Sequence, residues 1–182
     1  VFKPMHMKNS YFNPPQNIFD RIPPTEIDNI YRNQVVKGFV HDENAFLMGG
    51  ISGHAGIFSN THDIANYAQT MLNLGIYNGK RIFSRRSIRK ITKKQNMPYG
   101  SDYALGWDTP STRGNSAAGD FFSNGSYGHT GFTGTSLWVD PNQEIIIILL
   151  TNRTYPQREK DGLSMHQLRR NFHNEVMLTI KS

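Results

Sequence analysis

Apolar residues fall into a few short patterns along the chain, and each pattern predicts one element of secondary structure. An unbroken apolar run at 145–150 is typical of a strand that is buried on both faces. The preceding Asp140-Pro141-Asn142 segment predicts a turn, because proline presets φ and asparagine tolerates a left-handed conformation. We therefore expect two antiparallel strands joined at this turn, with the glycine-rich segment 128–136 opening the first.

Three stretches have apolar residues at helical spacing. The first is expected to begin at Asn60 or Thr61, which are good N-caps, and to end at Gly75. The second is predicted to begin near Ser84 and the third near Ser164. The apolar stripe of the third helix is expected to consist of Leu168, Phe172 and Val176.

The remaining chain is rich in turn-forming residues. Prolines and asparagines break up residues 1–44, where 35–40 is expected to form a short strand. Another short strand is predicted at 103–107. Residues 110–126 are rich in Ser, Gly and Asn, which favours an exposed loop.

Length and composition restrict the class of protein. The chain has 182 residues, which is enough for one domain or part of one. It begins with Val1-Phe2-Lys3-Pro4 rather than with a signal peptide or an initiator methionine, so we expect it to start inside a longer polypeptide. It has no cysteine and therefore no disulfide. It also has no run of eighteen apolar residues, so no membrane span is predicted.

The net charge of +6 comes largely from one segment without acids, which contains Lys80, Arg81, Arg85, Arg86, Arg89, Lys90, Lys93 and Lys94. Ile88 and Ile91 lie three residues apart among these cations, which favours a solvated helix with one buried side. No nucleic-acid motif accompanies the cluster, so nucleic-acid binding is not expected. The seven histidines show no metal-ligand spacing, and no metal or other cofactor is predicted.

Several segments, in the correct order, resemble the C-terminal part of serine β-lactamases and penicillin-binding proteins, especially the class C-like hydrolases. The strongest are Gly128-His129-Thr130-Gly131-Phe132-Thr133-Gly134 with Leu137-Trp138-Val139-Asp140-Pro141, and Leu149-Leu150-Thr151-Asn152-Arg153. Earlier matches are Val40-His41-Asp42-Glu43-Asn44-Ala45 and the stretch from Gly49-Gly50 to Asp63-Ile64-Ala65. Lys3-Pro4-Met5-His6-Met7 is a looser match to a Pro-Leu-Gly-Met segment.

The resemblance implies acyl transfer through a serine ester intermediate. His129-Thr130-Gly131 occupies the place of the family's Lys-Thr-Gly motif, with histidine replacing lysine. It implies that His129 hydrogen-bonds to substrate or tunes an acid–base group, that Thr130 and Gly131 contact substrate, and that the Phe132 N–H is an oxyanion donor. Taken alone, His129 is explained better by a hydrogen bond at a strand edge, and Gly131 and Gly134 are explained equally well by tight strand packing.

Neighbouring polar residues also have structural explanations. His41 and Asp42 border the site in the resemblance, although a hydrogen bond that stabilises the loop is the favoured use of either. His54 is expected not to touch substrate.

The family's other two motifs are absent at the expected places. Ser87-Ile88-Arg89-Lys90 fits Ser-x-x-Lys by letters, and Tyr11-Phe12-Asn13 and Tyr31-Arg32-Asn33 fit Tyr-x-Asn, but all three follow the segment that the family places after these motifs. We therefore expect the nucleophilic serine, its lysine and the tyrosine to lie upstream of Val1, so that this chain alone is inactive. The alternative is a non-catalytic binding or regulatory module with the same fold.

The fold implied by the resemblance is α+β, an antiparallel sheet flanked by helices beside a mainly helical region, and incomplete in this chain. We divide the chain into a loop-rich and helical region, 1–100, and the C-terminal strands and helix, 101–182. The implied partners are a small-molecule or peptidoglycan-like substrate and the upstream part of the same protein, and an exposed sheet edge allows a dimer. By analogy, the location is the periplasm or the cell surface.

Overall fold

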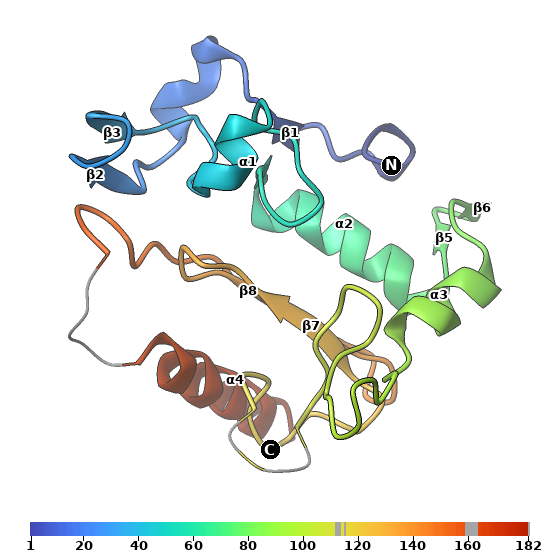
Figure 1. The fold of residues 1–182 in the computed structure, drawn as a ribbon. Coiled ribbons are helices and arrows are strands. Elements are labelled where there is room, and N and C mark those ends of the chain that lie inside the picture. Colours follow the sequence, from blue (N-terminus) through green and yellow to red (C-terminus); the bar gives the residue numbers. More distant parts are fainter. Residues whose placement is uncertain (112–113, 115, 159–163, 182) are drawn as a thin grey trace.

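An antiparallel sheet lies between two helices in the computed structural model, which describes residues 1–111, 114, 116–158 and 164–181 (Figure 1). Within these ranges the sheet has the order β7 (Tyr127–Thr130), β8 (Ser136–Asp140), β9 (Ile145–Leu149). Helix α2 (Thr61–Leu72) covers one face, and α4 (Met165–Lys181) covers the other (Figure 1). The architecture is α+β, as the resemblance implied.

Alternation along β8 sends neighbouring side chains into separate cores. Val139 packs toward α2 with a cluster of Ala68, Met71, Ile88, Ala104, Trp107 and Tyr127. Trp138 packs toward α4 with Ala117, Ala118, Phe122, Ile147 and Met177. Gly128 lies opposite Trp138, and a Cβ there would come within 2.3 Å of the indole ring, so the ring can lie over the strand only because residue 128 is glycine.

The turn between β8 and β9 forms as predicted. Asp140 pairs with Ile145 at the end of the β8–β9 ladder. The apolar run that follows contacts both cores, since Ile146 packs with the α2 cluster and Ile147 with the α4 cluster. Within the described residues, β9 pairs with β8 along one edge and has no strand along the other. Most of its side chains therefore stay half-buried.

Polar caps fix where the helices begin. The Asn60 side chain accepts a hydrogen bond from the Asp63 N–H at 2.9 Å, which confirms one of the two predicted caps of α2. The buried Asp63 carboxylate also accepts from the Asn9 N–H at 2.7 Å and the Ser10 hydroxyl at 2.9 Å, which ties the N-terminal segment to α2. Ser84 caps the basic helix α3 (Arg85–Thr92), also as predicted.

Short elements connect these larger ones. They are η1 (Lys3–Met5), β1 (Tyr11–Phe12) paired with β4 (Ile57–Phe58), η2 (Gln16–Arg21), β2 (Glu26–Asp28) paired with β3 (Gln34–Val36), α1 (Glu43–Leu47), and β5 (Ile76–Tyr77) paired with β6 (Lys80–Arg81). The strand expected at 35–40 thus begins earlier and is shorter. No helix among the described residues is long and apolar enough to cross a membrane.

Three local predictions are wrong. The stretch 103–107 forms an isolated bridge between Tyr103 and Asp108 rather than a strand. The described part of 110–126 is not wholly exposed, because Ala117, Ala118 and Phe122 fill the core under α4. The glycine-rich segment does not simply open β8. Its first residues form the separate strand β7, and residues 131–135 connect the two strands.

The buried side of α4 is rotated by one residue from the predicted stripe. Arg169, His173 and Met177, spaced four apart, are the buried residues of this helix. The predicted Phe172 and Val176 are partly buried at the edge of the core. The sequence pattern failed here because a charged and a titratable residue occupy the inner face.

His173 has a hydrogen-bond partner on each side of its ring. The ring is fully buried, Nδ1 lies 2.8 Å from the Ala117 carbonyl oxygen, and Nε2 lies 3.2 Å from the Ser136 hydroxyl. Because a carbonyl oxygen only accepts, Nδ1–H donates, and Nε2 accepts from Ser136 in a neutral ring. Burial lowers the pKa of His173 from its ordinary 6.5.

This burial predicts a loss of stability in mild acid. Below pH 6.5, His173 is protonated in the unfolded chain but stays neutral in the folded one. The free energy of unfolding therefore falls by about 1.4 kcal/mol for each unit of pH decrease because of this residue. The fall continues until the pH reaches the lowered pKa of the folded state. In urea unfolding at a series of pH values, His173→Asn should remove this slope, whereas exposed His62→Asn should not. An unchanged slope in His173→Asn would contradict the assignment.

Candidate active site

The predicted site begins at the end of β7, where His129 is exposed and Thr130 is half-buried. His129 Nδ1 lies 2.8 Å from the Thr130 carbonyl oxygen, so Nδ1–H donates to it. This hydrogen bond fixes which nitrogen faces the backbone and leaves Nε2 directed away from it. The strand-edge hydrogen bond considered from the sequence therefore exists, and it leaves the second ring nitrogen for another partner.

The loop that follows, 131–135, is fixed at several points. The Gly131 N–H donates to the Thr135 carbonyl at 2.8 Å, and the Gly134 N–H donates to the Gly131 carbonyl at 3.1 Å. A Cβ on Gly131 would come within 2.2 Å of the Thr135 hydroxyl. Tight packing thus explains this glycine on structural grounds alone, and the packing also fixes the backbone next to Phe132.

Arg169 on α4 is hydrogen-bonded to the same loop. Its guanidinium group donates to the carbonyl oxygens of Gly131 at 2.6 Å and Thr135 at 2.9 Å. The side chain is 8% exposed, and burial lowers its pKa. Charge-assisted hydrogen bonds to two carbonyls hold the loop more firmly than neutral ones. The sequence offered no signal for this contact, since Arg169 lies in a helix expected to present an apolar stripe.

The backbone carbonyl of Phe132 accepts a hydrogen bond, whereas its N–H has no partner in the part of the chain that the structure describes. Arg153 Nε donates to the Phe132 carbonyl oxygen at 2.8 Å, and the Arg153 N–H donates to the Thr133 carbonyl at 2.8 Å. Within the described residues, no acceptor is bonded to the Phe132 N–H. A fixed, unoccupied backbone donor beside a surface histidine is suited to bind an oxygen that develops negative charge.

The Phe132 ring lies among aromatic and cationic groups. The His41 ring is 5.3 Å from it, and the guanidinium groups of Arg153 and Arg158 are 4.7 and 5.6 Å from its centre. Arg158 also pairs with Glu26, at 2.8 Å, and with Glu43. Sequence reasoning missed Arg158. Its ion pairs connect residues more than a hundred positions apart, which local patterns do not show.

The loop at His41 and Asp42 packs beside Phe132. His41 Nδ1 is 3.0 Å from the Thr25 hydroxyl, and burial lowers the pKa of the ring. Asp42 caps α1 through the Ala45 N–H at 2.8 Å and lies 2.9 Å from His54 Nε2. Asp42 thus has the loop-stabilising role favoured from the sequence, and His54 contacts Asp42.

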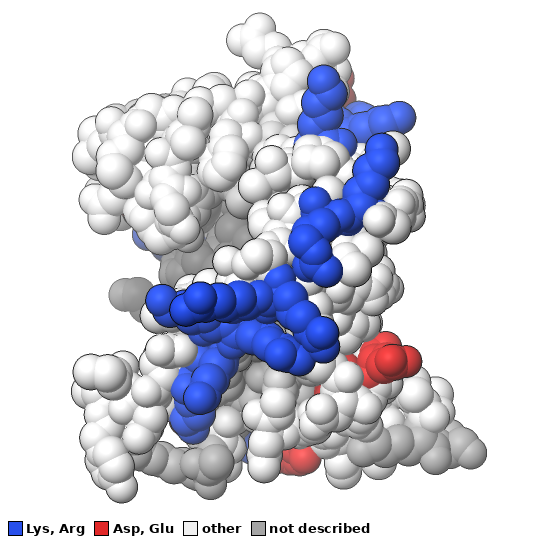
Figure 2. All heavy atoms as spheres, turned by 90° about the vertical axis from the view of Figure 1, so that its right-hand side faces the viewer, with Lys and Arg blue, Asp and Glu red and all other residues white. Residues whose placement is uncertain are grey.

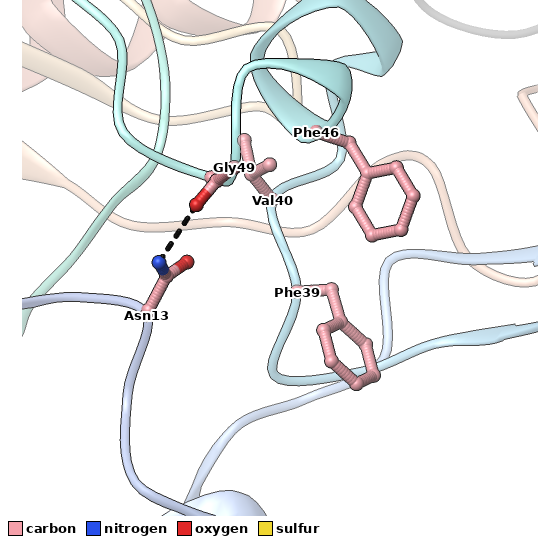
Figure 3. Close-up of a pocket in the computed structure, with 6 residues that line it drawn as sticks. Asn13, Phe39, Val40, Phe46 and Gly49 are labelled. Carbon is pink, nitrogen blue, oxygen red and sulfur yellow. Dashed lines mark hydrogen bonds between the residues drawn. The ribbon is translucent and has the colours of Figure 1, made fainter.

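Two pockets lie near these elements. An apolar pocket of about 310 Å³ is lined by Asn13, Phe39, Val40, Phe46, Gly49 and Gly50, with the two phenyl rings on one side (Figure 3). It contains none of the predicted site residues. A second pocket, of about 420 Å³, includes Thr130 with Arg169, Asp108 and Ser116 in its wall and is more polar. The polar pocket is therefore the cavity that adjoins the predicted site.

Comparison with known proteins decides the family. The model of the family described as Beta-lactamase matches residues 1–170. The chain belongs to the beta-lactamase family. A relative from Salmonella agona, named "Putative D-alanyl-D-alanine carboxypeptidase", is 37% identical over 172 residues, covering 85% of this chain and 39% of the relative. A relative of the same name from Salmonella typhi is 36% identical with the same coverage. The chain thus spans about two fifths of the length of these relatives.

Solved structures agree with this family in fold. Simvastatin synthase from Aspergillus terreus (LovD6 mutant) superposes with a TM-score of 0.64 at 12% identity, over 100% of this chain and 48% of that one. A penicillin-binding protein homologue from Caulobacter crescentus gives 0.59 at 15% identity, over 97% and 50%. At these identities the likeness concerns the fold, and it confirms the β-lactamase/transpeptidase-like α+β architecture.

In this beta-lactamase family member, the residues expected at the site lie together, because His129, Thr130, Gly131 and Phe132 follow one another from β7 into the loop. The Ser-x-x-Lys letter match lies on α3 instead. There the Ser87 hydroxyl is 2.7 Å from the Ser84 hydroxyl, and both Ser87 and Lys90 are exposed to solvent. Asn13 of the first Tyr-x-Asn match donates to the Gly49 carbonyl at 2.8 Å (Figure 3).

Proposed function

We propose that this chain forms one wall of the active site of a serine hydrolase that acts by acyl transfer on an amide, β-lactam or ester. The observation that carries the proposal is the Phe132 N–H, which is unbonded among the described residues while the carbonyl groups around it are held by Arg153 and Arg169. In this role the N–H is one of two donors to the oxyanion of the tetrahedral intermediate.

His129 and Thr130 face the substrate in this proposal. With Nδ1–H bonded to the Thr130 carbonyl, His129 Nε2 is the atom that meets the substrate or a neighbouring acid–base group. Thr130 adds a hydroxyl at the mouth of the polar pocket, and Gly131 keeps the backbone free of a side chain. No cofactor is part of this mechanism.

The nucleophilic serine, its lysine and the tyrosine come from the upstream part of the same protein. Two observations support this division of the site. Ser87 and Lys90 lie on the outer surface of α3, and the free edge of β9 is a row of backbone donors and acceptors next to half-buried isoleucines. We propose that upstream strands pair with this edge and bring the nucleophile with them. In their absence, the same edge offers a route to a dimer.

The named relatives support a proposed substrate and location. D-alanyl-D-alanine carboxypeptidase in the name of the Salmonella proteins points to a peptide such as that of peptidoglycan, and hence to the periplasm or cell surface. The polar pocket is lined by Thr130, Arg169, Asp108 and Ser116. Such a lining is better suited to bind a peptide than to bind a wholly apolar acyl group.

Replacement of His129 tests the proposal in the intact protein. His129→Ala should lower kcat/KM for a chromogenic acyl substrate about 10- to 100-fold, the value of one hydrogen bond to a charged group. Exposed His62 on α2 is the matched control, and His62→Ala should leave kcat/KM unchanged. Equal rates for His129→Ala and the wild type would remove His129 from the site. An intact protein that neither turns over nor binds covalently would favour a non-catalytic module.

A further inference from the structure

The surface around α3 is strongly and almost exclusively cationic. Between Ile64 and Ser101 the sequence contains no Asp or Glu. Figure 2 shows Lys and Arg side chains in a band across this face. We call the exposed cations of α3 and its flanks the basic face; they are Lys80, Arg81, Arg85, Arg86, Arg89, Lys90 and Lys93.

Arg81 donates to the Leu74 and Phe83 carbonyl oxygens at 3.1 and 3.0 Å, and among the described residues the other cations of the basic face form no side-chain hydrogen bond. Ile88 turns inward, where it is 2% exposed in the α2 core, and the charged residues of α3 turn outward. Lys94, which follows them, forms an ion pair with Asp102. Within the described ranges, no carboxylate pairs with any residue of the basic face. Among the described residues, therefore, no paired carboxylate offsets the self-repulsion of this cluster.

An exposed apolar loop extends the basic face. Met97 and Tyr99, in the loop after α3, are 80% and 94% exposed. The loop is tied back beside the helix, because the Leu105 N–H donates to the Ile91 carbonyl at 3.1 Å and the Gln95 N–H donates to the Tyr103 carbonyl at 3.0 Å. Tyr103 and Leu105 are themselves 59% and 47% exposed. Cations and exposed apolar tips are therefore held next to each other by the backbone.

We propose that the basic face docks on the surface of a bilayer that contains anionic lipids. Lys and Arg bind the lipid phosphates, while Met97 and Tyr99 enter the boundary between headgroups and acyl chains, where methionine and tyrosine side chains are stable. A nucleic acid would use the same cations, but it offers no apolar layer to a methionine and a tyrosine exposed at the tip of a loop.

Docking in this way leaves the Phe132 loop of the proposed active site accessible. Helix α3 lies at the end of the molecule opposite to β2 and β3 (Figure 1). The loop that contains Phe132 is bonded to Arg153, and the chain beyond it reaches β2, where the Ile27 N–H donates to the Pro156 carbonyl at 2.7 Å. The Phe132 loop therefore lies at the β2 end, away from the lipid, while the polar pocket extends from Thr130 to Ser101, Asp102 and Tyr103, beside the docking loop.

The test is sedimentation of the intact protein with vesicles. Vesicles of phosphatidylcholine and phosphatidylglycerol in equal parts should bind the protein, and vesicles of phosphatidylcholine alone should bind it far less. The paired substitutions Arg85→Gln and Arg89→Gln should weaken binding to the anionic vesicles on the order of 30-fold, as expected for the loss of two cations at the surface. The paired substitutions Met97→Ser and Tyr99→Ser should weaken the binding that persists at high salt.

A control with the same change of net charge separates a local effect from a general one. Arg21→Gln with Lys37→Gln removes two cations at η2 and next to β3, far from α3, and should leave vesicle binding unchanged. Thermal melting of each variant checks that it is folded. Equal losses in the two charge pairs, no binding to anionic vesicles, or retention of the protein by DNA with no effect of Met97→Ser and Tyr99→Ser would each overturn the proposal.

Discussion

Replacing Phe132 with proline should lower kcat of the intact protein about 100- to 1,000-fold, the cost of losing one oxyanion donor. Proline removes the backbone N–H, which is the group the proposed mechanism uses. Proline requires a negative φ, and Phe132 is not among the residues with positive φ, so the backbone at this position does not exclude proline. The measurement is the acylation rate with a chromogenic ester, followed by burst kinetics.

The control for this substitution keeps the donor and removes the ring. Phe132→Ala retains the N–H but loses the contacts of the phenyl group with His41, Arg153 and Arg158. It should lower kcat by less than about 10-fold, because these contacts position the loop and do not stabilise the transition state directly. If alanine and proline reduced kcat equally, the ring and not the N–H would be the functional part of Phe132.

The largest loss of stability is expected for Trp138→Ala, at about 3–5 kcal/mol in the free energy of unfolding. The Trp138 side chain is fully buried and packs against Phe122, with ring centroids 5.8 Å apart, and against His173, at 6.5 Å. Gly128 lies under the ring, so truncation opens a cavity between β7, β8 and α4. Urea unfolding of the variant and the wild type gives the difference.

Trp138→Phe makes this prediction more specific. Among the described residues, the buried Trp138 Nε1–H has no hydrogen-bond partner, which costs the folded state free energy. Phenylalanine removes this unpaired donor and still fills most of the space, so its cost should be below about 2 kcal/mol. A phenylalanine variant as unstable as the alanine variant would mean that the core requires the full indole shape.

Local patterns predicted much of the fold. Periodicity and capping residues located α2 and α3, and the Asp140-Pro141-Asn142 turn located the β8–β9 hairpin. These features depend on neighbours in sequence, which is why they can be seen there. The division of the chain near residue 100 stays a prediction.

The failures came where distant residues decide the structure. Arg169 and His173 replace apolar residues on the inner face of α4, because Gly131, Thr135, Ala117 and Ser136 supply their hydrogen bonds. A hydropathy pattern assigns such residues to the surface.

The candidate site was likewise only partly visible. The sequence of His129, Thr130, Gly131 and Phe132 drew attention to it through the resemblance. The sequence did not show that Arg153 holds the Phe132 carbonyl, since this contact joins residues from two separate loops. Which groups fix the donor can be learned only from the fold.

The central claim, that this chain is one wall of a serine hydrolase site completed from upstream, is tested most directly by locating a covalent adduct. The intact protein is treated with a serine-directed β-lactam or fluorophosphonate probe, digested, and analysed by peptide mass spectrometry. We predict a single acylated or phosphonylated serine that precedes Val1, with Ser87 unmodified. An adduct on a serine within residues 1–182, or no adduct with any such probe, would contradict the account.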